Sequence, residues 1–111
     1  MASAKHFKAI QRHCLAKAGA VEDYPWGDVV WKVNGKIFAS GCDSTNEFTV
    51  KATPDEQRRL IRDRAIKVAA YVGRFGWVTV TVSDARTLKL AKTLIGRSYG
   101  AVAKRKSKPG R

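Results

Sequence analysis

The dipeptide Asn34-Gly35 lies between two runs of β-prone residues, 29–33 (VVWKV) and 36–40 (KIFAS). A type I′ turn needs a positive φ at both central residues, and Asn-Gly is a pair that adopts such angles readily. Both runs have the length of a strand and contain the β-branched and aromatic residues that favour sheets. Residues 29–40 are therefore predicted to form an antiparallel hairpin, so the fold must include a β-sheet.

Three further runs extend this sheet. Residues 47–52 alternate apolar and polar side chains, which is typical of a strand with one solvated face. Residues 66–72 and 77–82 are two more β-rich runs, separated by the loop 73–76 with a glycine at each end. The pattern predicts five strands, joined mostly as hairpins and therefore antiparallel.

Helix signals occur at three places and predict helices over residues 4–18, 54–63 and 85–103. Their predicted N-caps are Ser3, then Thr53 in a capping box with Glu56, and finally Ser83 or Asp84. Between the first helix and the hairpin, residues 19–28 (GAVEDYPWGD) contain Pro and Gly among acidic residues, which indicates a turn-rich connector.

The order of these elements predicts one α+β domain over residues 1–103. Its antiparallel five-stranded sheet carries the helices on one face, because the first and the last helix each have an apolar stripe to bury. A chain of 111 residues is of the size of one domain. Residues 104–111 are predicted to form a flexible basic tail.

Charge is the main clue to function: 22 Lys and Arg against 9 Asp and Glu give a net charge of +13. Such a surface attracts polyanions, although a basic surface that serves solubility alone remains an alternative. We expect a non-enzymatic nucleic-acid-binding protein, with duplex DNA favoured over RNA and the hairpin loops 34–35 and 73–76 entering a groove. The predicted nucleic-acid-binding residues are Lys5, Lys8, Arg12, Lys32, Lys36, Arg58, Arg59, Arg62, Arg74, Arg86, Lys89, Arg97, Lys104, Arg105 and Lys106.

The tryptophans raise a second hypothesis. Trp31 and Trp77 are expected in the core, because large aromatic side chains usually fill the buried face of a sheet. Trp26, in a Pro-Trp-Gly turn, is either folded over the sheet edge or exposed. The alternative function is a protein-interaction or small anionic-ligand module, with a pocket formed by Trp26, Arg74 and Trp77.

Metal and thiol chemistry are not indicated by the sequence. His6 and His13 share a helix face, but neither has Cys, Asp or Glu at the spacing of metal ligands. Cys14 belongs to the apolar stripe of the first helix, and Cys42 has no adjacent base to activate it. We therefore expect no metal, no cofactor and two free thiols.

The acidic residues of the connector do not indicate an enzyme. Its carboxylates have no partnered histidine, and a turn favours simple surface placement over general acid–base catalysis; they are Glu22, Asp23 and Asp28. No apolar run approaches the roughly 20 residues of a membrane span, and no signal-peptide core is present. We expect a cytoplasmic protein without a membrane partner that is a monomer.

Four segments together resemble the MmcQ/YjbR family. They are 19–27 (GAVEDYPWG), 33–38 with its Gly-Lys-Ile-Phe, 71–78 (YVGRFGWV) and 94–99 (LIGRSY). The resemblance covers nearly the whole chain and implies a frataxin-like (CyaY-like) α+β fold and a DNA-binding function. It implies no catalytic or ligand residues. Some members carry a His immediately before the Trp of the third segment, where this chain has Gly76.

Members of the frataxin-like fold bind iron through an acidic ridge on the first helix and first strand. The first helix of this chain has no acidic residue, and its charged side chains are Lys5, Lys8, Arg12 and Lys17. A metal cation bound there would be repelled by these positive side chains. The fold resemblance is therefore not expected to bring iron binding with it.

Overall fold

The computed structural model describes residues 2–25, 28–42, 44–70 and 72–106. Its helices are α1 (Ala2–Leu15), α2 (Pro54–Leu60) and α3 (Ala85–Lys106), with a 3₁₀ turn η1 (Gly73–Phe75). Its strands are β1 (Val21–Asp23), β2 (Val29–Val33), β3 (Lys36–Gly41), β4 (Glu47–Val50), β5 (Ile66–Val68) and β6 (Val78–Thr81).

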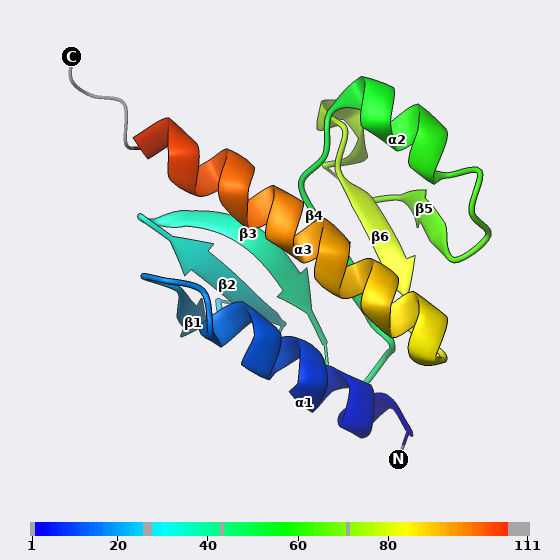
Figure 1. Cartoon of the computed structure of the whole chain (residues 1–111), viewed down its shortest axis with the longest axis horizontal. Helices are drawn as coiled ribbons and strands as arrows, with labels where there is room; N and C mark the ends of the chain where they lie inside the picture. The colour runs from blue at the N-terminus through cyan, green and yellow to red at the C-terminus, as the bar shows by residue number, and fades with distance from the viewer. Residues whose placement is uncertain (1, 26–27, 43, 71, 107–111) are drawn as a thin grey trace.

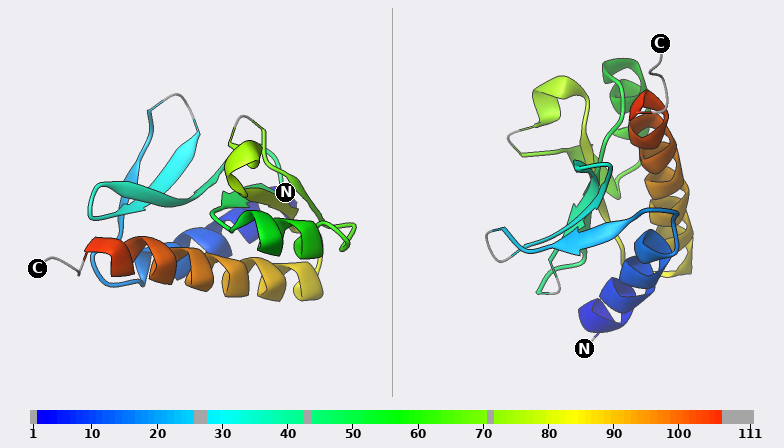
Figure 2. Two further views of the ribbon diagram at one scale, coloured as in Figure 1. Left: turned by 90° about the horizontal axis from the view of Figure 1, so that it is seen from above. Right: turned by 90° about the vertical axis from the view of Figure 1, so that its left-hand side faces the viewer.

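The strands form one antiparallel sheet in the order β1-β2-β3-β4-β6-β5. The helices α1 and α3 lie side by side across one face of this sheet, and α3 contacts β2, β3, β4 and β6 (Figure 1). In the views of Figure 2, η1 and the β1–β2 ribbon rise on the side of the sheet away from α3. The molecule is therefore a two-layer α+β sandwich, and we call the side of the sheet away from α1 and α3 the open face.

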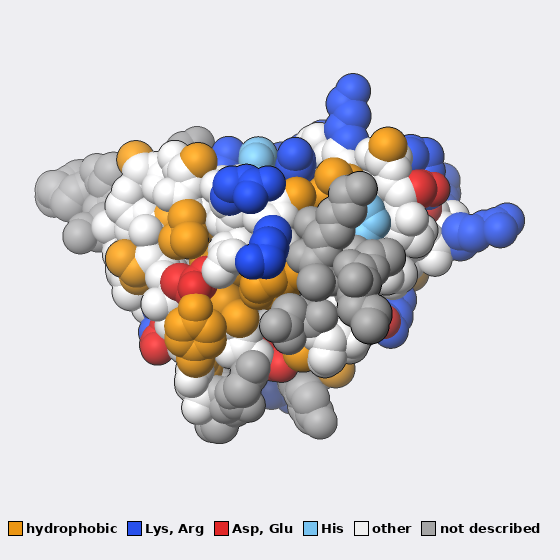
Figure 3. Space-filling model, turned by 90° about the horizontal axis from the view of Figure 1, so that it is seen from below, with side chains coloured by type: hydrophobic (Ala, Val, Ile, Leu, Met, Phe, Trp, Pro, Cys, Tyr) orange, Lys and Arg blue, Asp and Glu red, His pale blue; other side chains and the backbone are white. Residues whose placement is uncertain are grey.

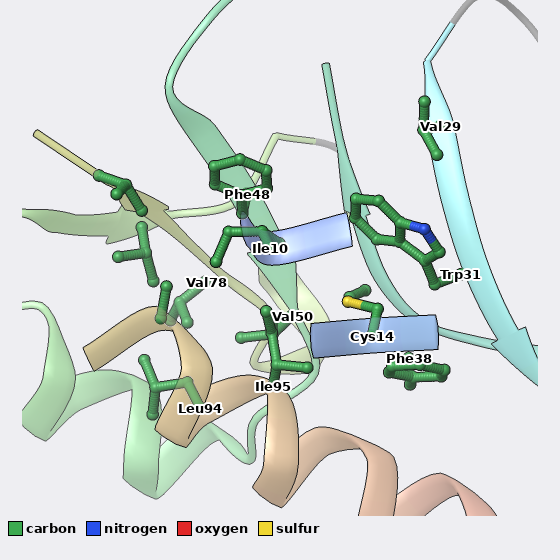
Figure 4. Packing of buried hydrophobic residues seen from close by; sticks show 14 of the residues in the cluster. Ile10, Cys14, Val29, Trp31, Phe38, Phe48, Val50, Val78, Leu94 and Ile95 are labelled. Carbon is green, nitrogen blue, oxygen red and sulfur yellow. The ribbon is translucent and has the colours of Figure 1, made fainter. Parts of the chain in front are cut away.

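The core fills the space between the sheet and the two long helices (Figure 4). Trp31 and Phe48 of the sheet are fully buried there, and the ring of Phe7 from α1 lies 5.9 Å and 6.3 Å from their rings. Ile95 of α3 closes the other side and is also fully buried. The prediction that Trp31 belongs to the core is confirmed.

The sheet has six strands, so the prediction of five was wrong. The additional strand, β1, lies inside the predicted connector 19–28 and pairs with β2. Its position is stabilised by the carboxylate of Glu22, which accepts hydrogen bonds from Gln11 Nε2 at 2.9 Å and from Trp31 Nε1 at 2.8 Å. These contacts join distant parts of the chain, and they override the local preference of this segment for turns.

Local signals gave the β2–β3 turn and the caps of α2 and α3 correctly. Asn34 and Gly35 have φ of 56° and 79°, as the predicted type I′ turn requires. Thr53 and Glu56 form the predicted capping box, with reciprocal bonds of 3.1 Å and 2.9 Å. The N–H of Thr87 donates to Asp84 Oδ1 at 2.9 Å at the start of α3, so Asp84, rather than Ser83, caps that helix. The predicted cap of α1 was wrong, because that helix begins at Ala2 and Ser3 lies inside it.

Several helices and strands end at residues other than the predicted ones. Helix α1 ends at Leu15 instead of residue 18, and the chain then turns through Gly19 at a φ of 75°. Strand β5 ends at Val68 rather than residue 72. Helix α3 runs through Lys106, three residues beyond its predicted end, while residues 107–111 of the predicted tail lie outside the described residues.

Within the described residues, no helix combines the length and the apolar character needed to cross a membrane.

Candidate ligand groove on the open face

The strand register arranges two rows of side chains across the open face. In the first row, Val30 pairs with Ser40, Ser40 pairs with Thr49, and Thr49 pairs with Thr79. The hydroxyls of Thr49 and Thr79 are hydrogen-bonded at 2.8 Å. Alternate residues of a strand point to opposite faces, so this row lies opposite the core residues of the same strands.

The second row lies roughly 7 Å from the first, two residues away at the usual strand rise: on β2, just after the end of β4 and just before the start of β6. It begins with the pair Lys32 and Ile37. It continues with Lys51 and Trp77, whose neighbours Val50 and Val78 are paired in the ladder. The ammonium of Lys51 lies 5.8 Å from the centre of the Trp77 ring.

These rows line a groove of about 540 Å³. Its lining residues are Val30, Lys32, Gly35, Lys36, Ile37, Ser40, Thr49, Lys51, Val72 and Trp77. Most of its surface is apolar, and its side chains include three branched apolar residues, an indole, three lysines and two hydroxyls. Such a lining suits a ligand with a flat apolar part and a negative charge.

The position of Trp77 is fixed through its backbone. Its carbonyl accepts hydrogen bonds from Gln57 Nε2 at 3.0 Å and from Ala69 N at 3.2 Å. The same Gln57 amide donates to the carbonyl of Gly73 at 2.7 Å, so α2 holds both ends of the η1 turn. Because the preceding residue, Gly76, has a φ of 102° and a Cβ there would lie 2.5 Å from Ala52 O, only glycine fits at that position.

The expectation that Trp77 belongs to the core was therefore wrong: its side chain is half-buried and lines the groove. In β6 the core positions are taken by Val78, Val80 and the following Val82. Strand alternation then places Trp77 on the other face, whatever its size.

The Ser98-Tyr99 pair of α3 supports the groove from the core side. Ser98 is fully buried, and its hydroxyl donates to Phe38 O at 2.6 Å and accepts from Lys51 N at 3.1 Å. The ring of Tyr99 packs edge-on against Phe38, with ring centres 5.3 Å apart. The pair fixes β3 at its bulge and holds the backbone of Lys51 where its side chain reaches Trp77.

The three groove lysines differ in electrostatic setting. Lys32 Nζ lies 3.1 Å from the carboxylate of Asp23, and this hydrogen bond lowers the pKa of Asp23. Among the described residues, no ion pair involves Lys36 or Lys51. Lys36 and Lys51 are consequently the groove cations most available to an anionic ligand.

The predicted nucleic-acid-binding residues do not form one surface. Lys32 and Lys36 line the groove, whereas others are exposed on the helices that cover the opposite face: Lys8, Arg12, Arg86, Lys89 and Arg97. Figure 3, which views the molecule from the side of α1, shows Lys and Arg side chains in separate places, with hydrophobic and acidic side chains between them. The groove and the helix face are therefore separate surfaces on opposite sides of the sheet.

A third group lies on α2 and the turn after it and consists of Arg58, Arg59 and Arg62, all exposed. Arg58 is paired with Asp55, and the guanidinium of Arg86 on α3 contacts Asp63 at 2.9 Å and 3.2 Å. The side chains of Lys5, Lys104, Arg105 and Lys106 lie outside the described part of the molecule.

The predicted pocket of Trp26, Arg74 and Trp77 is not formed by the residues that can be placed. Trp77 lines the groove, but Arg74 is exposed and its guanidinium stacks on the neighbouring Phe75 ring, 4.9 Å from its centre. Trp26 lies outside the described residues. The 73–76 segment turns as a 3₁₀ helix, which directs Arg74 to solvent rather than into the groove.

The sequence did not identify Lys51, Ser40, Thr49 or Gln57 as residues of a binding site. A signal existed for Thr49 and Lys51, because the run Phe48-Thr49-Val50-Lys51 alternates and puts these two polar residues on the solvated face. No comparable local signal exists for Gln57, because its bonds to η1 depend on the tertiary packing of α2.

Thiols and imidazoles lie away from the groove. Burial raises the pKa of the Cys14 thiol to about 12, and the side chain is enclosed in the core. One ring nitrogen of His13, Nε2, lies 3.2 Å from Lys92 O, and burial lowers the pKa of this imidazole. Among the described residues, no three His, Cys, Asp or Glu side chains gather as metal ligands would.

Fold and groove together define a two-layer α+β protein with a cationic, aromatic groove on its open sheet face. A family model described as YjbR matches residues 15–101, and the chain belongs to the YjbR family, as its resemblance to MmcQ/YjbR proteins indicated.

Two solved structures share the fold. A Deinococcus radiodurans protein described as a DUF419 domain has a TM-score of 0.78 and 20% sequence identity, over 92% of this chain and 81% of that one. A Pseudomonas syringae protein has a TM-score of 0.68 and 18% identity, over 86% of this chain and 97% of that one. A search of curated proteins found no match.

Proposed function

We propose that this protein binds nucleic acid through the groove on its open face, without catalysing a reaction. The observation that carries the proposal is the second row, where the Lys51 ammonium lies over the Trp77 ring and Lys32 borders the same groove. Phosphates are the anions that a protein of net charge +13 attracts most strongly in a cell, and a polyanion can contact several lysines at once.

DNA is the partner we favour over RNA, in line with the function that the family resemblance implies. The groove lies between the β2–β3 turn, which contributes Gly35 and Lys36, and the η1 region, which contributes Val72 and Trp77. The first predicted loop therefore lines the groove through Gly35, and the second, 73–76, lies between two residues that line it. This arrangement supports the hypothesis that both loops contact the nucleic acid.

We also propose that the protein is a monomer and lies in the cytoplasm. The two free thiols, Cys14 and Cys42, support a reducing compartment. A frataxin-like (CyaY-like) relationship is supported by the antiparallel sheet with α1 and α3 on one face.

A small anionic ligand is the second candidate, and the groove volume favours it. About 540 Å³ lies within the roughly 300–1,000 Å³ typical of small-molecule sites. Under this alternative a nucleotide or another aromatic anion would bind, and the affinity would depend little on the number of linked nucleotides.

Fluorescence anisotropy with labelled DNA, RNA and heparin over a series of salt concentrations tests the proposal. We expect DNA to bind more tightly than heparin of equal charge, and Lys51→Gln to weaken DNA binding several-fold. The matched control is Lys89→Gln, which removes the same charge from the exposed surface of α3. Equal affinity for heparin and DNA, or equal effects of both variants, would refute a nucleic-acid site in the groove.

A further inference from the structure

We infer that the groove binds a single-stranded segment, with one unstacked base against the Trp77 ring and its phosphates on Lys36 and Lys51. This inference rests on the proposed nucleic-acid function and names the form of nucleic acid bound. It differs from the expectation of duplex DNA made from the sequence.

The first argument is the chemistry of the groove floor. Val30, Ile37, Val72 and Trp77 line it with apolar side chains, and most of the groove surface is apolar. A duplex presents phosphates, sugars and base edges, while the flat faces of its bases are hidden by stacking. An apolar recess therefore has little to bind on a duplex, whereas a single strand offers aromatic faces that leave water when they enter it.

The second argument is the fixed position of the indole. Gln57 and Ala69 hold the Trp77 carbonyl, and Gly76 allows the close approach of the chain to Ala52. A ring whose backbone is already fixed loses little conformational freedom when a base stacks on it. Trp77 is thus a preorganised platform on the groove wall, although it is only half-buried.

The third argument is the proximity of the platform to cations. In a nucleotide the base and its phosphates are joined through one sugar, so a site needs a ring and a cation close together. Lys51 Nζ lies over the Trp77 ring, 5.8 Å from its centre. A base that stacks on this face takes the place of the ammonium, which then binds the phosphate. Lys36, at the β2–β3 turn, borders the same groove and is placed for a neighbouring phosphate.

The hydroxyls of the first row suit the edge of a base. Ser40 and Thr49 are paired across β3 and β4 on the floor of the groove. Hydroxyls donate and accept, so they can bond to the polar edge of any base without selecting one. The site is expected to distinguish single-stranded from paired nucleic acid more strongly than it distinguishes sequences.

The test compares three labelled probes of equal length: oligo-dT, an abasic single strand and a hairpin duplex. Each is titrated against the wild type, Trp77→Phe and Trp77→Leu, with heparin as competitor. Leucine keeps the apolar bulk but removes the aromatic plane, and thermal unfolding of each variant verifies that it folds.

We expect oligo-dT to bind the wild type roughly tenfold more tightly than the abasic strand, because one base–aromatic stack contributes about that factor. Trp77→Leu should lose this preference, Trp77→Phe should keep most of it, and duplex binding should stay within twofold. Lys51→Gln should weaken both single-stranded probes, because both carry phosphates.

Tighter binding of the duplex than of oligo-dT, or an unchanged preference in a folded Trp77→Leu variant, would overturn the single-strand inference alone. If heparin competes equally for all probes and Lys51→Gln has no effect, the proposed nucleic-acid function fails as well. The two failures are therefore distinguishable in one set of titrations.

Discussion

The indole Nε1 of Trp31 donates a 2.8 Å hydrogen bond to the carboxylate of Glu22, and Gln11 Nε2 donates to the same oxygen at 2.9 Å. The hydroxyl of Tyr24 donates to the other carboxylate oxygen. Burial raises the pKa of Glu22, but these three hydrogen bonds outweigh it, and the net pKa is lowered. One acidic side chain thus connects α1, β1 and β2.

Replacing this carboxylate should destabilise the protein. Glu22→Ala leaves the Trp31 and Gln11 donors without their acceptor, and we expect a loss of about 1–3 kcal/mol in the free energy of unfolding, the usual cost of leaving a buried donor without a partner. Urea denaturation measures this value. Asp28→Ala, at an exposed carboxylate in the same region, serves as the control and should change it by less than about 0.5 kcal/mol. Equal effects of the two variants would contradict a stabilising role for Glu22.

Acid sensitivity should depend on the pair Asp63 and Arg86. The hydrogen bond from the Arg86 guanidinium, followed by that from Ala65 N, lowers the pKa of Asp63 from 3.8 to about 2. The folded state therefore gains stability from ionised Asp63 above about pH 4, and this gain is lost as the pH falls toward 2. In Arg86→Gln the free energy of unfolding should fall less steeply between pH 4 and 2.

Chemical denaturation at several pH values tests this dependence. Arg62→Gln is the control, because it removes a positive charge from an exposed residue next to Asp63. The prediction fails if Arg86→Gln and the wild type lose stability with the same slope in this window.

The buried hydroxyl of Ser98 should matter for both folding and the groove. Ser98→Ala leaves Phe38 O and Lys51 N without a partner, which should cost about 1–3 kcal/mol of unfolding free energy. Thr93→Ala removes an exposed hydroxyl that bonds Lys89 O on the same helix, and it should cost far less. Thermal or urea unfolding of the two variants decides between a structural hydroxyl and a dispensable one.

Where the sequence prediction succeeded, the deciding interactions are local. The Asn34-Gly35 turn follows from the φ angles of those two residues, and the start of α2 follows from Thr53 and Glu56, three residues apart. Both signals depend on neighbours in the chain, so no tertiary information is needed to read them.

Where it failed, the deciding interactions are distant. Strand β1 has only three residues, two of them acidic, and its place in the sheet depends on the bonds from Gln11 and Trp31 to Glu22. Trp77 is a different case, because the alternation of threonine with Val78 and Val80 already assigned it to the open face. The general preference of tryptophan for the core predicts the opposite placement, and the strand pattern overrides it.

Removing the charge of Asp23 should strengthen nucleic-acid binding, because the ion pair with Lys32 competes with a phosphate for that lysine. For Asp23→Asn we expect affinity at low salt to rise about 1.4- to fivefold, as an exposed ion pair contributes roughly 0.2–1 kcal/mol. Asp55→Asn is the matched control: it changes the net charge equally and releases Arg58 on α2. Equal gains from both variants would assign the effect to net charge rather than to the groove.

The central claim is that nucleic acid binds the open face, and nuclear magnetic resonance of the ¹⁵N-labelled protein titrated with oligo-dT tests it most directly. We expect the largest shifts at amides of the two rows, such as Thr49 and Lys51, and at the indole N–H of Trp77. Amides of α1 and α3 near Lys8 and Arg97 should shift little, because these helices cover the other face of the sheet. Shifts concentrated on α1 and α3, with the Trp77 indole unchanged, would contradict the account.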